Sequence, residues 1–190
     1  MTKIAVKTED LGKYYTLVSP KTAILVTAVD ENGKPNIITL AWHSPVSIDP
    51  PLFGISIHPK RYTHELIERT KEFVVNFPSW KLLEKVHYCG STSGRKADKF
   101  RATGLTPWPS TKVRPPSIAE CYLHLECKLG RSPALGDHTW FTGHIVAITA
   151  DEGAFEDGIL RESGDPILYM GKDRYQNLRA HRVQMRERNR

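Results

Sequence analysis

The alternation of apolar and polar positions predicts β-strands at the start of the chain. Residues 22–30 are rich in β-branched side chains, which is typical of a strand. Asn32 and Gly33 follow, and both tolerate the positive φ of a tight hairpin turn. A return strand is predicted over 36–42 and, after a proline-punctuated stretch over 45–51, a third strand over 52–58. Strands joined by a tight turn run antiparallel, so we expect the sheet to begin as a meander.

The middle of the chain predicts two helices, a strand and a glycine-rich loop. Thr63 is the expected N-cap of the first helix, because its hydroxyl can accept from a free backbone amide. Prolines at 107, 109, 115 and 116 indicate a long irregular connection further on. The predicted elements are, in order, a helix over 63–70, a strand over 72–77, a helix from Ser79, a loop over 90–95 and a short helical turn over 97–101.

The clearest alternation of the chain lies at residues 121–129. Two cysteines and three leucines would point to one side, and Tyr122, His124, Glu126 and Lys128 to the other. This pattern is typical of a half-buried strand. Cys121 and Cys127 then belong to the core rather than to a metal site. Further strands are predicted over 140–149 and 167–170.

About six strands with few helices favour a mainly β fold with α insertions. An antiparallel barrel is the expected architecture, because closure of the sheet removes exposed strand edges. No internal repeat and no linker divides the sequence, so residues 1–190 are expected to form a single domain.

Net charge adds one feature, a basic C-terminal tail. The chain carries a net charge of +6, and seven basic against two acidic residues follow position 171. The tail from about Arg179 is expected to be a solvated end, and the absence of interleaved aromatic and basic residues disfavours nucleic acid as a partner. The sequence has no apolar run of membrane-spanning length, no secretory signal and only three scattered cysteines. We therefore expect a cytoplasmic protein without a membrane partner.

Polar residues that could bind a ligand gather where the predicted strands end. Arg61 directly precedes a predicted helix, whose free amides and dipole attract anions, and its guanidinium matches phosphate geometry. Residues 90–96 and Lys99 form a second segment suited to anions, although neither segment is a Walker loop or a dinucleotide fingerprint. A capped helix and a surface loop explain the same residues without a ligand. The sequence shows neither a metal-ligand spacing nor a nucleophile elbow, so a cofactor would have to carry any chemistry.

Three blocks, in this order, resemble the flavin reductase-like, flavoredoxin-type family. They are residues 36–51 (NIITLAWHSPVSIDPP), 55–66 (ISIHPKRYTHEL) and 136–146 (GDHTWFTGHIV). The likeness runs from about Ser19 to Tyr175. It implies an FMN-binding antiparallel split β-barrel that forms a homodimer with the flavin close to the subunit interface, and it leaves FAD as the alternative flavin.

The resemblance also implies which residues contact the flavin. The segment 39–42 matches the one that lies along the isoalloxazine, Ser56, Arg61 and Thr63 match positions near the phosphate and ribityl chain, and Ser91, Ser93 and Lys99 match further contacts less closely. His138 matches the histidine beside the flavin face that nicotinamide approaches, although it could instead cap the start of a strand. The full set of expected cofactor contacts is Asn36, Thr39, Leu40, Ala41, Trp42, Ser56, Ile57, His58, Arg61, Tyr62, Thr63, Ser91, Ser93 and Lys99, with His138 as the catalytic residue.

The activity implied by this resemblance is NAD(P)H-dependent flavin reduction, in which hydride passes from the nicotinamide to the flavin and electrons pass on to a protein or small acceptor. Family members that supply reduced flavin to two-component monooxygenases often have small serines where this chain has Ala41 and Trp42, and this departure leaves the electron acceptor open. A second hypothesis is an FMN-binding electron carrier that nicotinamide does not reduce. A third is a nucleic-acid or partner-binding module that uses the basic tail.

Overall fold

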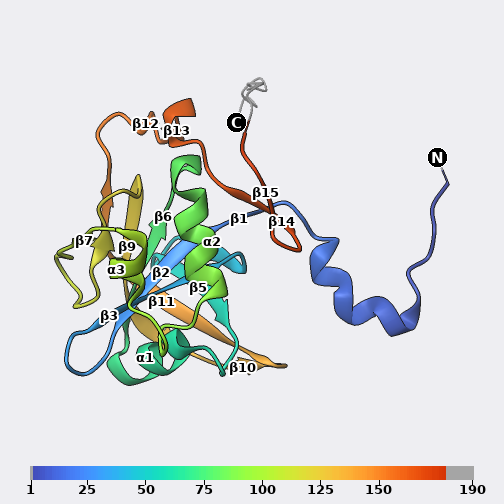
Figure 1. Cartoon of the computed structure of the whole chain (residues 1–190), viewed down its shortest axis with the longest axis horizontal. Coiled ribbons are helices and arrows are strands. Elements are labelled where there is room, and N and C mark those ends of the chain that lie inside the picture. Colours follow the sequence, from blue (N-terminus) through green and yellow to red (C-terminus); the bar gives the residue numbers. More distant parts are fainter. Residues whose placement is uncertain (1, 179–190) are drawn as a thin grey trace.

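The computed structural model describes residues 2–178, and the basic tail expected from about Arg179 lies outside the described residues. One antiparallel sheet dominates the molecule (Figure 1). Its strands follow the order β3-β2-β6-β9-β11-β5-β4, with β10 paired to β11. The bounds are β2 Ile24–Val29, β3 Pro35–Leu40, β4 His43–Ser47, β5 Leu52–Ile57, β6 Glu72–Phe77, β9 Leu123–Arg131, β10 Ala134–Leu135 and β11 His138–Ala150. The sheet curls around its core without closing, so the expected split barrel is confirmed.

Smaller elements surround this sheet. A second sheet has the order β1-β14-β15, and two further strand pairs are β7 with β8 and β12 with β13. The helices are η1 Thr8–Thr16, α1 Tyr62–Thr70, η2 Trp80–Leu82, α2 Leu83–Ser91, α3 Lys99–Thr103 and η3 Glu162–Gly164. The remaining strands are β1 Lys21–Thr22, β7 Pro107–Trp108, β8 Ser117–Ile118, β12 Phe155–Glu156, β13 Ile159–Leu160, β14 Leu168–Gly171 and β15 Arg174–Gln176. Within residues 2–178, no helix is long and apolar enough to cross a membrane.

The hairpin of β2 and β3 forms as predicted. Gly33 has a φ of +83°, and the Asp30 carboxylate accepts from the backbone amides of Asn32 and Lys34 at 3.0 and 2.8 Å. The predicted meander is wrong beyond this hairpin, because β5 pairs with β11 and β4 instead of with β3. The stretch read as a proline-punctuated connection supplies β4, in which Pro45 is tolerated because an edge strand leaves one side of its backbone unpaired.

Two apolar clusters flank β2, all of whose side chains are buried. The inner cluster fills the curled sheet and includes Phe73, Phe141 and, from α1, Ile67. The outer cluster lies between β2, β3 and the helices α2 and α3. Cys121 and Cys127 are fully buried, as predicted for core residues. Because helices cover its outer face as well, β2 is apolar at every position except Thr27, whose hydroxyl donates to the Pro116 carbonyl at 2.6 Å.

Strand β9 is more deeply buried than its alternating sequence predicts. His124 and Glu126, which we expected on a solvent-facing side, are 7% and 1% exposed. The Glu126 carboxylate accepts from the backbone amides of Thr111 and Lys112 at 2.8 and 2.6 Å, and His124 Nε2 bonds to the Ile118 carbonyl at 2.9 Å. A buried carboxylate is tolerated when its oxygens accept such bonds. The irregular segment therefore packs against β9 and satisfies its buried polar side chains.

Candidate flavin site

A cavity of about 500 Å³ opens where β3 and β5 end. Its volume falls within the range of roughly 300–1,000 Å³ that is usual for small-molecule sites. Ten of the fifteen predicted site residues line it: Thr39, Leu40, Ala41, Trp42, Ser56, Ile57, His58, Arg61, Ser91 and His138. The first two sequence blocks meet here because the Ser56 amide donates to the Trp42 carbonyl at 2.9 Å, which ties β5 to the residues that follow β3.

One end of this cavity is cationic and rich in backbone donors. Arg61 is the N-cap residue of α1 and lines the cavity with an exposed side chain, so the cavity lies next to the start of the helix, where free amides and the positive end of the dipole favour anions. Gly90 and Ser91, at the end of α2, line the same cavity. The predicted N-cap at Thr63 is wrong: this residue lies inside the helix, and its hydroxyl accepts from the Asn36 side chain at 2.8 Å.

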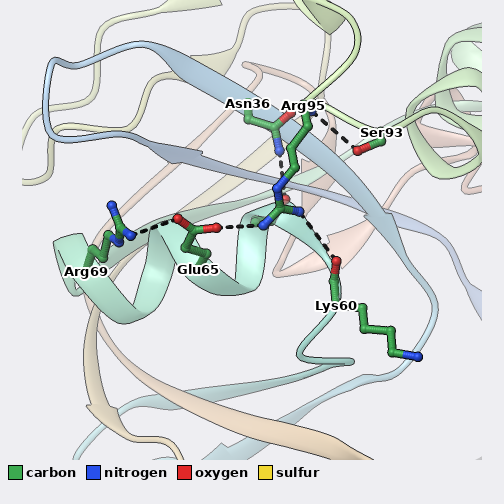
Figure 2. A network of polar contacts seen from close by, with 7 residues as sticks. Asn36, Lys60, Glu65, Arg69, Ser93 and Arg95 are labelled. Carbon is green, nitrogen blue, oxygen red and sulfur yellow. Dashed lines mark hydrogen bonds and ion pairs between the residues drawn. The ribbon is translucent and has the colours of Figure 1, made fainter.

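A polar network holds the loop after α2 against α1 (Figure 2). The Arg95 guanidinium donates to Glu65 at 2.6 Å, and Arg69 pairs with the other oxygen of Glu65 at 3.0 Å. The Ser93 hydroxyl accepts from the Arg95 amide at 3.3 Å. Gly94 approaches Asn36 so closely that a Cβ there would lie 1.9 Å from the amide oxygen. The network fixes the loop position next to the Arg61 end of the cavity.

Five predicted contacts are not part of the cavity lining. Asn36 and Thr63 are buried and bond to each other, Tyr62 lies beneath the Arg95 guanidinium, and Ser93 belongs to the network of Figure 2. Lys99 is 4% exposed, and its ammonium donates to the carbonyls of Ile37 at 2.7 Å and Cys89 at 2.6 Å. Burial lowers the pKa of Lys99 to about 8. In this structure these side chains support the elements that carry the site.

The other end of the cavity is aromatic. The rings of Trp42 and His138 lie 4.9 Å apart at 38°, and His58 meets His138 edge-on at 5.2 Å. His138 Nδ1 lies 2.7 Å from the Asp137 carboxylate, and this hydrogen bond holds the pKa of Asp137 below its ordinary value. With its proton on Nδ1, a neutral His138 keeps Nε2 as an acceptor.

Sequence reasoning missed several residues that line the cavity. Tyr15 comes from η1 and meets Trp42 at 5.8 Å, while Tyr169 and Tyr175 come from the β14–β15 hairpin. His87 Nδ1 lies 3.2 Å from the Tyr175 hydroxyl, which links α2 to this hairpin. These residues are far from the recognised motifs in sequence. No local pattern marks them, because only tertiary packing brings them to the site.

The arrangement suits a flat, apolar ring system with an anionic tail. Aromatic side chains pack against flat rings, and a guanidinium at a helix N-terminus binds phosphate. Both features line one cavity. No cluster of three His, Cys, Asp or Glu side chains able to hold a metal ion occurs within residues 2–178.

Comparison with known proteins shows the family. The model of the flavin reductase like domain matches residues 18–179, so this chain belongs to the flavin reductase-like family. An uncharacterized protein of Archaeoglobus fulgidus is 42% identical over 138 residues, which cover 73% of this chain and 76% of that protein.

Two solved structures share the architecture over nearly the whole chain. Flavoredoxin of Desulfovibrio vulgaris (Miyazaki F) matches with a TM-score of 0.83 and 27% identity, covering 97% of this chain and 96% of that chain. The FMN-binding protein of Thermus thermophilus with bound 1-cyclohex-2-enone matches with a TM-score of 0.82 and 29% identity, covering 97% and 100%.

Proposed function

We propose that this chain is an NAD(P)H-dependent flavin oxidoreductase that holds FMN in the cavity between β3, β5 and α2. One observation carries the proposal: a single cavity joins the Arg61 end of α1 to the aromatic end at Trp42 and His138, in a chain of the flavin reductase-like family. FMN is proposed over FAD because a neighbour along the whole chain is an FMN-binding protein. When bound, the flavin would accept hydride and pass electrons on one or two at a time.

Arg61 is the proposed phosphate ligand. Its guanidinium has parallel N–H donors that match a phosphate. The free amides at the N-terminus of α1 contribute the positive end of the helix dipole at the start of the same helix. The segment 39–42 would lie along the ring system, where its backbone and the indole of Trp42 exclude water. The Thr39 hydroxyl donates to the Val86 carbonyl at 2.5 Å, so it anchors this segment to α2.

His138 is the proposed nicotinamide-positioning residue. The Asp137 carboxylate holds its Nδ1–H, and the rings of Trp42 and His58 pack against its imidazole. A ring restrained on three sides presents Nε2 in a fixed orientation, so an incoming nucleotide would meet an ordered acceptor.

A second candidate is an FMN-containing electron carrier that nicotinamide does not reduce. The specific observation is that Trp42 and His138, whose rings lie 4.9 Å apart, both line the cavity, so the pair takes up space beside the flavin that a nicotinamide would need. The resemblance in structure to a flavoredoxin is consistent with either candidate.

The deciding experiment is an anaerobic titration of the purified protein. We expect FMN to bind with visible absorption bands, and we expect NADH or NADPH to bleach these bands under argon. A yellow protein that both nucleotides leave yellow would favour the carrier. A protein that takes up no flavin would contradict both candidates.

Substitution of Arg61 tests the placement of the flavin, and Arg69 offers a matched control. Both arginines lie at or in α1, but Arg69 pairs with Glu65 on the helix surface and does not line the cavity. We expect Arg61→Ala to lower FMN affinity by about 10- to 100-fold, because a charge-assisted bond to phosphate contributes about 1.5–3 kcal/mol. We expect Arg69→Ala to leave this affinity close to that of the unchanged protein.

A further inference from the structure

Two histidines, His58 and His138, line the aromatic end of the cavity from neighbouring strands. His58 directly follows β5, and His138 is the first residue of β11, the strand that pairs with β5. Both side chains are partly buried, and their rings lie 5.2 Å apart at 85°. Strand pairing therefore holds the two imidazoles next to each other, although they are far apart in sequence.

The backbone determines which nitrogen of His58 carries the proton. Its Nδ1 lies 3.1 Å from the backbone nitrogen of Lys60. A backbone N–H can only donate, so Nδ1 is the acceptor of this bond. A neutral His58 therefore carries its proton on Nε2, which becomes a donor. Among residues 2–178, the bond to Lys60 is the one hydrogen bond of this side chain, so the Nε2–H is unpaired.

His138 has the opposite arrangement. Its Nδ1 lies 2.7 Å from the Asp137 carboxylate, which can only accept, so Nδ1 carries the proton. The lone pair of a neutral His138 is then on Nε2, and within the described part of the chain this atom has no hydrogen-bond partner. The cavity lining thus contains one fixed donor and one fixed acceptor on adjacent rings.

This pair differs from other histidines of the protein. Three of them use Nε2 to bond to an oxygen of the protein itself: His43 at 2.8 Å, His64 at 2.8 Å and His124 at 2.9 Å. Their rings connect elements of the fold. The internal bonds of His58 and His138 engage Nδ1 instead and leave Nε2 available to a ligand.

A primary carboxamide is the group that matches this pair. Its carbonyl oxygen accepts and its NH2 group donates, and both are attached to one carbon atom. A carboxylate offers acceptors only and would leave the lone pair of His138 beside a negative charge. A methyl ketone lacks the donor. A site built to bond to a polar group discriminates against an analogue without it, because a polar atom of the site then loses its partner.

We propose that His58 and His138 together bind the carboxamide of the nicotinamide ring, with His58 Nε2–H donating to the carbonyl oxygen and His138 Nε2 accepting from the NH2 group. This assignment rests on the proposed function, in which the nicotinamide nucleotide is the electron donor. It gives His58, expected from the sequence resemblance to contact the flavin, a role in binding the other substrate. Two bonds to one planar group fix the rotation of the attached ring, and hydride transfer depends on that orientation.

The protonation of the two rings is measured first, because this needs neither flavin nor nucleotide. Two-dimensional proton–nitrogen NMR of protein with isotope-labelled histidine distinguishes the tautomers. At about pH 8, above the ordinary pKa of histidine, we expect the proton of His58 on Nε2 and that of His138 on Nδ1. The reverse tautomer at either residue would overturn the proposal.

An analogue of the nucleotide tests the two bonds separately. Reduced 3-acetylpyridine adenine dinucleotide has a methyl group in place of the NH2 group, so it keeps the acceptor and loses the donor. Stopped-flow reduction of the FMN-loaded protein gives a second-order rate constant for NADH and for the analogue. The ratio of the two constants is compared between variants, because the analogue also differs from NADH in its strength as a hydride donor.

We expect His138→Ala to lower this ratio roughly 3- to 10-fold, the equivalent of one hydrogen bond. His58→Ala should slow reduction by both nucleotides to the same extent and leave the ratio unchanged, because the carbonyl is common to both. The matched control is His87→Ala, which removes a third histidine of the cavity lining whose Nδ1 bonds to Tyr175. This control should keep both rate constants close to those of the unchanged protein.

The outcomes separate this assignment from the proposed function. Bleaching of the flavin with an unchanged ratio in His138→Ala, or with unchanged rate constants in His58→Ala, would overturn the assignment alone. If the pair held the flavin instead, both variants would weaken FMN binding without altering the ratio, which would also overturn it. A protein that takes up no FMN, or FMN that no nicotinamide nucleotide reduces, would contradict the proposed function and the assignment with it.

Discussion

The burial of Lys99 gives a prediction for the pH dependence of stability. Its ammonium is 4% exposed and donates to two backbone carbonyls, one from β3 and one from α2. A neutral amine keeps two N–H groups, so it can retain both bonds after it loses a proton. Deprotonation therefore removes the cost of a buried charge without removing its hydrogen bonds.

The magnitude follows from the displaced pKa of Lys99. Burial lowers this pKa from 10.5 to about 8, so between these values the unfolded chain holds a proton that the folded protein has released. Stability rises with pH wherever the unfolded state binds more protons. The contribution of Lys99 to the free energy of unfolding should thus become more favourable between pH 8 and pH 10.5. At about 1.4 kcal/mol per pH unit, the total gain is on the order of 3 kcal/mol.

Urea unfolding of the unchanged protein and of Lys99→Met, at a series of pH values from 7 to 10, measures this contribution. The difference between the two is the relevant quantity, because burial raises the pKa of neighbouring Cys89 to about 11 and its thiol makes the opposite contribution. We expect the advantage of methionine over lysine to shrink as the pH rises above 8. A difference in unfolding free energy that stays constant from pH 7 to pH 10 would refute the reasoning.

Three further substitutions test the loop, the site and the core. Gly94→Ala places a Cβ 1.9 Å from the Asn36 amide oxygen and should break the buried bond to Thr63, at a cost of about 1–3 kcal/mol in urea unfolding; an unchanged midpoint would contradict this. His138→Ala should slow the reduction of bound flavin in stopped-flow measurements more than it weakens FMN binding, and an unaltered reduction rate would remove the proposed role. Phe141→Ala, at a fully buried position, should cost about 3–5 kcal/mol by calorimetry, and a loss below 1 kcal/mol would mean that the core repacks.

Local signals in the sequence are sufficient to predict where strands form but not which strands pair with each other. The hairpin at Asn32 and Gly33 follows from turn chemistry, and the strand over 72–77 follows from composition. The pairing of β5 with β11 joins residues more than 80 positions apart, for example Ile57 and Thr139. No turn specifies such a pairing, so only the burial of the inner cluster against the curled sheet selects it.

The same limit applies to the site. The first two blocks led to the residues that line the cavity from β3, β5 and the start of α1, because in each a strand ends among polar residues, and the third block led to His138 at the start of β11. Sequence type alone does not reveal what a polar side chain contacts. Lys99 bonds to backbone carbonyls and Asn36 to Thr63, while Tyr15 reaches the cavity from an arm that carries none of the blocks.

The three cysteines restrict how electrons could leave the proposed flavin. All three are fully buried, and burial raises the pKa of Cys89 to about 11, that of Cys127 to about 12 and that of Cys121 well above its ordinary value. Buried thiols of high pKa stay protonated and are poor nucleophiles, so a dithiol relay is disfavoured. Electrons would then leave through the cavity mouth beside Trp42 and His138.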